Sequence, residues 1–250
     1  MPSDNYLNQI INKYAVNEAG AKLQVLAIRP AIQRWAQQYL LETIFSGSIA
    51  KGTAILLSTD ADVFISLSSV TPGTLSHMYE TLFNALNQAG LQPRRQNVSI
   101  GVTSGGFKID LVPGKRQSQF GYDHSIYKNK AHSWTQTNVK THIDYVKTSN
   151  RTKEIKLTKI WRQLNRLDFP SFYLEMAIID CLAGRSTTDL SGNFWEALGF
   201  LAGNFLNRRY IDPSNTNNVI SDDLTNAEKQ LVQSAAQASR RQTNWGQIVW

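Results

Sequence analysis

Two segments of this chain, Ala61–Leu67 and residues 107–112, alternate apolar and polar residues and carry aspartates on their polar sides. Successive side chains of a β-strand point to opposite faces, so this alternation predicts strands with one buried face. On that pattern Asp60 and Asp62 leave the same face of the first strand, and Asp110 leaves the polar face of the second. The three carboxylates can therefore meet across one sheet.

Carboxylates that converge in this way repel one another unless a cation neutralises them. Hard oxygen ligands suit Mg²⁺, which keeps several waters and binds substrate phosphates. Phosphoryl transfer is served by two such ions about 4 Å apart, because they clamp the attacking and leaving oxygens. We therefore predict that Asp60, Asp62 and Asp110 are catalytic residues that bind two Mg²⁺ ions, with Mn²⁺ as a substitute. Asp60 can instead be a turn or N-cap residue, whereas Asp62 and Asp110 are flanked by apolar residues and would be costly to bury unpaired.

A glycine-serine turn precedes the first of these strands. Residues 43–45 predict a short strand, and Gly47 and Ser48 follow it. At a turn that leads into a helix, backbone N–H groups and a hydroxyl can hold a polyphosphate without obstruction by side chains. We therefore predict that Gly47 and Ser48 bind the phosphates of a nucleotide.

Taken together, these motifs resemble the signature of polymerase-β-type nucleotidyltransferases, with FSGSIAKGT at 45–53, TDADV at 59–63 and IDLVP at 109–113. More narrowly, the chain resembles the branch of oligoadenylate synthases, bacterial cyclic-oligonucleotide synthases related to cyclic GMP–AMP synthase, and archaeal-type CCA-adding enzymes. EIKLTKIWR at 154–162 is similar to the lysine-bearing helix of that branch, and DPSNTNNV at 212–219 is similar to its C-terminal segment. The matches run from about residue 40 to about residue 240.

The resemblance implies a template-independent nucleotidyltransferase that uses Mg²⁺ and a nucleoside triphosphate such as ATP and releases pyrophosphate. It favours a linear or cyclic oligonucleotide second messenger as the product, and with it a place in antiviral defence. Asp60 and Asp62 would then bridge both ions, and Asp110 would complete the ion that activates the acceptor hydroxyl. Lys159 would neutralise the triphosphate, although Lys156 lies one turn earlier on the same helix and competes for that role.

Other functions remain open at this point. The net charge of +7, with basic residues concentrated in 147–166, suits a polyanionic partner and supports an RNA 3′-end nucleotidyltransferase. In that case Lys147, Arg151 and Lys153 would meet the RNA. A small-molecule nucleotidyltransferase would share the glycine-serine and aspartate motifs. A catalytically silent nucleic-acid-binding module is disfavoured, because three acids facing a polyanion would weaken binding.

The remaining sequence predicts an α+β fold. We expect a mixed-sheet catalytic lobe with N-terminal helices over residues 1–137, a helical lobe over 138–250, and the active site in the cleft between them. Helical periodicity is expected at residues 5–40, with a kink or break at Pro30, and further on at 75–89, 139–148, 152–166, 171–183, 193–206 and 224–239. Further strands are expected at 98–103, 125–127 and 133–137.

Composition bounds the location of the protein. The chain has 250 residues, no run of about 18 apolar residues, and no basic-then-apolar start of the kind that signal peptides have. Its one cysteine, Cys181, lies in an apolar run and has no partner for an internal disulfide. We therefore expect a cytoplasmic protein without a membrane partner.

Overall fold

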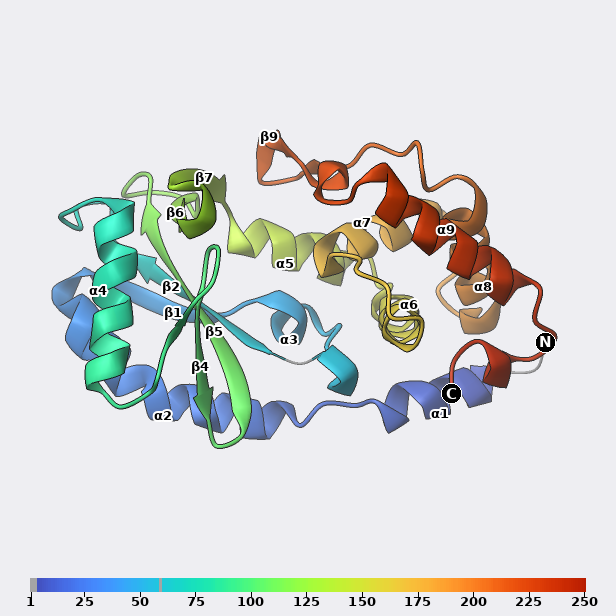
Figure 1. The fold of residues 1–250 in the computed structure, drawn as a ribbon, viewed down its shortest axis with the longest axis horizontal. Helices are drawn as coiled ribbons and strands as arrows, with labels where there is room; N and C mark the ends of the chain where they lie inside the picture. The colour runs from blue at the N-terminus through green and yellow to red at the C-terminus, as the bar shows by residue number, and fades with distance from the viewer. Residues whose placement is uncertain (1–3, 59) are drawn as a thin grey trace. The chain divides into compact units, whose positions relative to one another are not determined.

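A computed structural model describes residues 4–58 and 60–250 of the chain, which divides into two compact units. The sheet unit contains Asn17–Ala50 and the described residues of Thr59–Ile143. The helical unit contains the described residues of Met1–Val16, together with Lys51–Ser58 and Asp144–Trp250. Helices and a mixed sheet are both present, as the predicted α+β class requires (Figure 1).

Seven of the described strands form one mixed sheet. Along its main path the strands follow the order β1 (Leu40–Phe45), β2 (Ala61–Leu67), β5 (Phe107–Arg116), β4 (Ile100–Ser104) and β3 (Arg94–Arg95). Strands β2 and β5 are parallel, and the other pairs along this path are antiparallel. The end of β5 pairs with β6 (His124–Lys128), which pairs with β7 (Ser133–Thr137). The weak strand signals at 125–127 and 133–137 are thereby confirmed.

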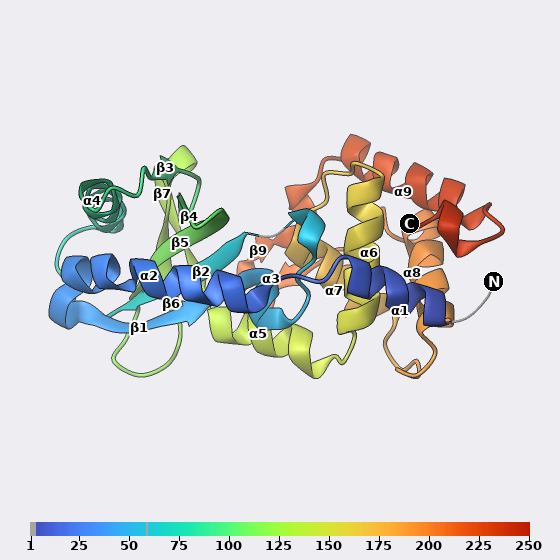
Figure 2. The same ribbon diagram turned by 90° about the horizontal axis from the view of Figure 1, so that it is seen from below.

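Helices α2 (Glu18–Ala36) and α4 (Leu75–Gln88) contact each other and the sheet (Figure 1, Figure 2). Side-chain caps define where they begin, because Asn17 accepts from the N–H of Gly20 and Thr74 accepts from that of His77. Of the kink or break expected at Pro30, the break is absent, because α2 continues through that residue. The helical stretch is instead interrupted between Lys13 and Glu18. Two helices follow sheet strands, α3 (Gly47–Lys51) after β1 and α5 (Val139–Thr148) after β7.

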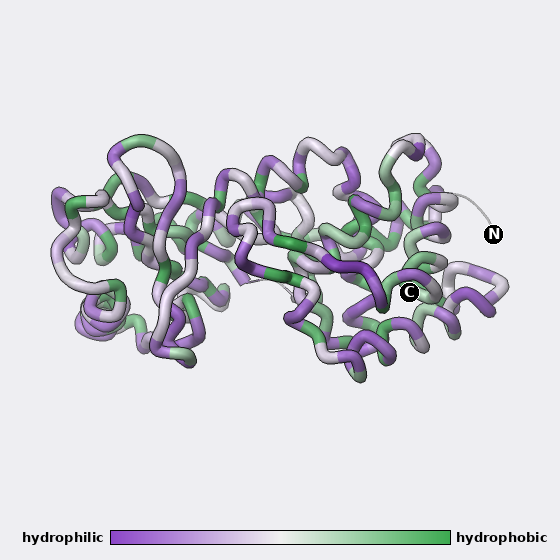
Figure 3. The backbone as a smooth tube through the Cα atoms, turned by 90° about the horizontal axis from the view of Figure 1, so that it is seen from above, coloured by the Kyte–Doolittle hydropathy of each residue, from purple (hydrophilic) through white to green (hydrophobic). Residues whose placement is uncertain are grey.

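The helical unit is built from α1 (Asp4–Lys13), α6 (Thr152–Leu164), α7 (Ser171–Cys181), α8 (Leu190–Gly203) and α9 (Asn226–Arg240). It also contains a hairpin of β8 (Ile211–Asp212) and β9 (Asn215–Val219), which the sequence pattern did not predict. Hydrophilic and hydrophobic residues alternate along the helices of both units (Figure 3), as helices with one buried face require. Short 3₁₀ helices occupy Gln37–Tyr39, Leu56–Ser58, Asn129–Ala131, Ile220–Asp223 and Trp245–Gln247.

The N-terminal helix belongs to the helical unit rather than to the sheet unit. Leu7 and Ile10 on α1, and Ile55 from the segment Lys51–Ser58, lie in one buried core with residues of α6, α7 and α8. The expected lobes, 1–137 and 138–250, placed all three residues with the sheet. Their hydrophobic side chains pack on the later helices, so the division into units is discontinuous along the chain.

None of the helices in the described part of the chain is both long and apolar enough to span a lipid bilayer.

Candidate active site

Asp62 and Asp110 are directly paired residues of the parallel strands β2 and β5. Paired residues of neighbouring strands project from the same face of a sheet, so the two carboxylates lie side by side on one face. Both side chains are half-buried. Asp60 lies just before β2 begins and is exposed. The structure therefore brings Asp62 and Asp110 together and places Asp60 at the entry to the strand, outside the ladder.

The polar face that the alternation predicted for β2 is only partly correct. Phe64 and Ser66, which follow Asp62 on that face, are buried. Phe64 packs against His124 in a T-shaped contact with ring centroids 4.9 Å apart, and the Ser66 hydroxyl and His124 Nε2 share a hydrogen bond of 2.8 Å. Along the described part of β2, Asp62 is thus the residue of this face that reaches the surface.

Gly47 lies against the carboxylate of Asp62. A Cβ atom on Gly47 would stand 1.7 Å from Asp62 Oδ2, and the backbone φ of +56° lies in the left-handed region. The neighbouring Ser46 N–H donates to the Asp62 carbonyl at 2.8 Å. A residue with a side chain is therefore excluded at Gly47 by both space and conformation. Helix α3 begins at Gly47, so Gly47 and Ser48 present the first N–H groups of a short helix beside Asp62.

The surroundings of Asp110 favour the neutral, protonated form of its carboxyl group. Burial raises its pKa above the ordinary value, and the negative charge of Asp60 raises it further. A hydrogen bond from Gln96 and the charges of Arg94 and Lys108 oppose that rise. A cation on this face would favour the ionised carboxylate, so the electrostatics fit a metal ligand.

The fit to two ions is partial in this geometry. In residues 4–58 and 60–250, no three histidine, cysteine, aspartate or glutamate side chains gather closely enough to hold a metal ion. Asp62 and Asp110 supply two adjacent carboxylates of the oxygen-ligand kind that Mg²⁺ prefers. Asp60, in the exposed residues before β2, lies close enough for its charge to raise the pKa of Asp110. The metal role of all three aspartates stays a prediction.

Lys159 lies in a buried charge cluster of the helical unit. Its Nζ donates to Glu175 Oε1 at 2.6 Å and to Thr53 Oγ1 at 3.0 Å, and the residue is 1% exposed. Lys51 Nζ lies 2.5 Å from the other oxygen of Glu175. Lys156 is half-buried and makes no ion pair or hydrogen bond with the described residues. The role of Lys159 toward a triphosphate stays a prediction, and Glu175 is a partner that the sequence pattern did not reveal.

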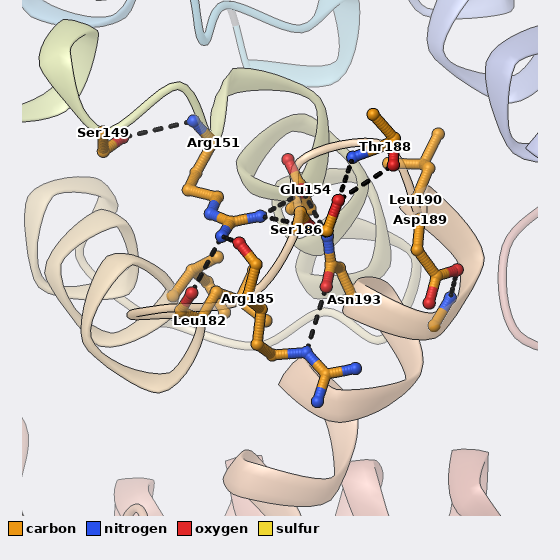
Figure 4. A network of polar contacts seen from close by, with 12 residues as sticks. Ser149, Arg151, Glu154, Leu182, Arg185, Ser186, Thr188, Asp189, Leu190 and Asn193 are labelled. Atoms are coloured by element: carbon orange, nitrogen blue, oxygen red, sulfur yellow. Dashed lines mark hydrogen bonds and ion pairs between the residues drawn. The ribbon is translucent and has the colours of Figure 1, made fainter.

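Arg151 is not available to RNA, contrary to the expectation from its place in a basic segment. It is 5% exposed and lies 3.2 Å from Glu154 Oε1 (Figure 4). Its guanidinium also donates to the carbonyls of Leu182, Arg185 and Ser186, which follow helix α7. Burial of an arginine requires such partners, and this arrangement anchors the chain between α7 and α8. Lys147 and Lys153 are exposed, as a polyanion-binding role would require.

Comparison with known structures confirms the predicted α+β fold, which matches solved structures of CD-NTases. The structure of Escherichia coli MS115-1 CdnC with ATP matches with a TM-score of 0.77 and 20% sequence identity, covering 96% of this chain and 90% of that one. Bradyrhizobium diazoefficiens CdnG in complex with GTP also matches with a TM-score of 0.77, at 14% identity over 97% of this chain and 94% of that one.

A curated relative is similar in sequence as well. The cyclic AMP-AMP-AMP synthase of Escherichia coli (strain MS 115-1) is 26% identical in an alignment of length 176, which covers 64% of this chain and 54% of the relative. The chain thus aligns with about half the length of this relative. No family model matches the chain. The predicted resemblance to bacterial cyclic-oligonucleotide synthases is confirmed.

Proposed function

We propose that this chain is a template-independent nucleotidyltransferase that synthesises a cyclic oligonucleotide second messenger from nucleoside triphosphates. The observation that carries the proposal is the pairing of Asp62 with Asp110 beside the bare backbone of Gly47. Carboxylates and a phosphate-binding turn are the two parts that nucleotidyl transfer needs, and the proposal assigns them to Asp62 and Asp110 and to the turn at Gly47, which lies against the Asp62 carboxylate. The similarity to a cyclic AMP-AMP-AMP synthase and to CdnC with ATP supports ATP as a substrate.

In this proposal the acceptor hydroxyl oxygen attacks the α-phosphorus of the triphosphate. A new oxygen–phosphorus bond forms, the bond to the leaving pyrophosphate breaks, and the hydroxyl proton passes to Asp110 or to water. The N–H groups that begin α3, at Gly47 and Ser48, hold the β- and γ-phosphates. Asp62 and Asp110, with Asp60, would hold Mg²⁺, which when bound would supply positive charge to the attacking and leaving oxygens.

The test is to incubate the purified protein with each radiolabelled nucleoside triphosphate, with and without total RNA, and to separate the products by chromatography. A cyclic messenger appears as a small labelled species that phosphatase does not degrade, formed without RNA. Asp62→Asn is the matched control, because it removes one carboxylate and changes no volume. Label in RNA would instead support 3′-end addition, and absence of any product with Mg²⁺ or Mn²⁺ would overturn the proposal.

A further inference from the structure

The carboxylate of Asp110 is held by a residue that no motif marks. Gln96 Nε2 donates a hydrogen bond of 2.8 Å to Asp110 Oδ1. The other oxygen, Oδ2, accepts no hydrogen bond from the described residues. One oxygen is thus fixed to the protein, and the other is left for a ligand. Gln96 and Asp110 both belong to the sheet unit.

Gln96 is itself fixed at both ends. The hydroxyl of Ser99 donates to Gln96 Oε1 at 2.8 Å. Because the carboxamide oxygen is taken by that donor, the carboxamide NH₂ must face Asp110, and the opposite orientation would set two acceptors together. The backbone is held too, since the Gln96 N–H donates to the Ser99 carbonyl at 3.0 Å. The buried Tyr79 hydroxyl lies 2.9 Å from the Ser99 carbonyl and 3.0 Å from the Gln96 carbonyl.

Gly101 provides the space for this contact. It is the residue of β4 that pairs directly with Asp110 on β5. A Cβ atom on Gly101 would lie 2.7 Å from Gln96 Nε2 and 3.1 Å from Asp110 Oδ1. The φ of Gly101 lies outside the left-handed region, so an alanine could adopt this backbone. Because Gly101 has no side chain, the Gln96 carboxamide can pass over this position of β4 and reach the Asp110 carboxylate.

We propose that Gln96 is the positioning residue for Asp110: its carboxamide, oriented by Ser99 and admitted by Gly101, fixes the carboxylate so that Oδ2 faces the metal and acceptor. This inference rests on the proposed function, in which Asp110 holds Mg²⁺ on the acceptor side. Residues that orient metal ligands in this way contribute about 10–100-fold to metal affinity or activity.

The direct test uses Gln96→Met, which removes the donor at similar volume, and Gln38→Met as the matched control on an exposed glutamine of the same unit. Binding of Mn²⁺ is followed by electron paramagnetic resonance, with and without a non-hydrolysable ATP analogue. Turnover is measured against nucleotide and Mg²⁺ concentration, and folding is checked by thermal unfolding. We expect Gln96→Met to weaken Mn²⁺ binding by about 10-fold or more and to lower kcat, with KM for nucleotide nearly unchanged and partial rescue by excess Mg²⁺.

Two further variants keep the proposal testable if Gln96→Met folds poorly. Gly101→Ala displaces the Gln96 carboxamide by steric contact and leaves Gln96 itself unchanged. Ser99→Ala removes the hydrogen bond that orients the carboxamide. Both variants should reproduce the loss of Mn²⁺ affinity, and the loss should be smaller in Ser99→Ala. Mn²⁺ affinity and kcat within about twofold of wild type in all three variants, while Asp110→Asn loses both, would overturn the role of Gln96 and leave the proposed function standing.

The opposite pattern separates the two proposals. If the wild-type chain forms no product but binds Mn²⁺, and that binding weakens in Gln96→Met, the role of Gln96 is supported and the proposed activity fails. A wild-type chain that binds no Mn²⁺ in either condition would overturn the positioning role as stated.

Discussion

Asp62 and Asp110 are paired across the parallel strands β2 and β5, so the register of one strand pair sets the spacing of two candidate catalytic groups. That register is fixed by the opposite face of the sheet, where the pairs Ala61–Ile109 and Val63–Leu111 are buried. A slip by one residue would turn an aspartate into the core. Hydrophobic packing behind the sheet therefore holds the geometry of the polar site in front of it.

Asp62→Asn and Asp110→Asn should each abolish nucleotide incorporation while the protein stays folded. Loss of one metal ligand removes several kcal/mol of transition-state stabilisation, which corresponds to at least about 100-fold in rate. Initial rates with Mg²⁺ and with Mn²⁺ check this. Turnover within tenfold of wild type in either variant would remove that aspartate from the site.

The same Asp110→Asn variant should be more stable than wild type without metal at pH 7. The folded-state pKa of Asp110 is raised, so the folded protein retains a proton that the unfolded chain has lost, and stability falls as pH rises through that window. Asparagine cannot lose a proton, so this fall disappears. Thermal unfolding in EDTA at pH 4 and pH 7 measures it; equal melting temperatures of the two proteins at pH 7 would contradict the expectation.

Gly47→Ala should impair triphosphate use more than its cost to stability explains. The left-handed φ alone costs about 1–2 kcal/mol for a residue with a side chain, and the new Cβ would also strike the Asp62 carboxylate. Gly106→Ala is the control, because its φ is +82° and nothing lies within 4 Å of a Cβ there. Gly106→Ala should show the stability cost of the left-handed φ alone, and Gly47→Ala should lose more stability because of the added clash. Only Gly47→Ala should lose nucleotide affinity in calorimetry. Unchanged affinity in Gly47→Ala would show that the phosphate-binding turn lies elsewhere.

Alternation and turn chemistry predicted much of this site and of its sheet. Strand β5 follows the expected alternation, whereas β2 follows it only at Asp62, because Phe64 and Ser66 are buried. Gly47 lies in the turn before β2 with a left-handed φ, and its binding of phosphate stays a prediction. Gln96 could not be found in this way, because its partner Ser99 and its gap at Gly101 become neighbours of Asp110 only when β4 pairs with β5. The spacing of apolar residues predicts where the strands lie, whereas the hydrogen bonds between β4 and β5 depend on how the two strands are paired.

Glu175→Gln should be the most destabilising change in the buried cluster of the helical unit. It leaves Lys51 and Lys159 buried without a counter-charge, and breaking a buried ion pair costs about 3–5 kcal/mol. Glu80→Gln is the control, because its pair with Arg95 is about 40% exposed and such pairs contribute about 0–1 kcal/mol. Thermal or urea unfolding compares them; equal losses would mean that water reaches Glu175.

Lys159→Met should change how stability depends on pH. Burial lowers the pKa of Lys159 to about 8 from 10.5, although the charge of Glu175 opposes that shift. Between those values the unfolded chain holds a proton that the folded protein has released, so the free energy of unfolding rises with pH. Methionine lacks this contribution, and Glu175 keeps Lys51 as its partner. The free energy of unfolding of wild type minus that of the variant, measured by urea unfolding, should therefore increase from pH 8 to pH 10.5. A difference that does not change with pH would contradict the lowered pKa of Lys159.

The double variant Lys147→Ala, Lys153→Ala should keep nucleotide turnover without RNA, because both side chains are exposed and a messenger synthase needs no RNA groove. Filter binding to single-stranded RNA should be weak in wild type. The logarithm of its binding constant should fall only slightly with the logarithm of salt concentration, whereas each phosphate contact contributes a slope of about −0.7. Arg151→Met belongs in a separate stability experiment, where loss of its carbonyl contacts should lower the melting temperature. A turnover that requires RNA and disappears in the double variant would favour RNA 3′-end addition.

Charge counting could not separate these basic residues. Arg151, Lys159 and Arg162 are buried, whereas Lys147 and Lys153 in the same segment are exposed. The difference arises from Glu154 and Glu175 and from carbonyl groups beyond α7, which reach the buried cations only in the folded helical unit. Hydrophobic periodicity predicted helix α6, but it does not show which charged side chains of that helix form buried ion pairs.

The packing of helix α1 also determines when the protein can finish folding during synthesis. Leu7 and Ile10 share a core with Ile248 and Val249, and the Tyr6 hydroxyl donates to the Val249 carbonyl at 2.9 Å. A ribosome adding about 5–20 residues per second needs on the order of 10–50 seconds between those two ends of the chain. The strands of the sheet unit emerge well before then. Helix α1 is thus synthesised well before the C-terminal residues that complete its core, although α6 and α8, which it also contacts, emerge earlier.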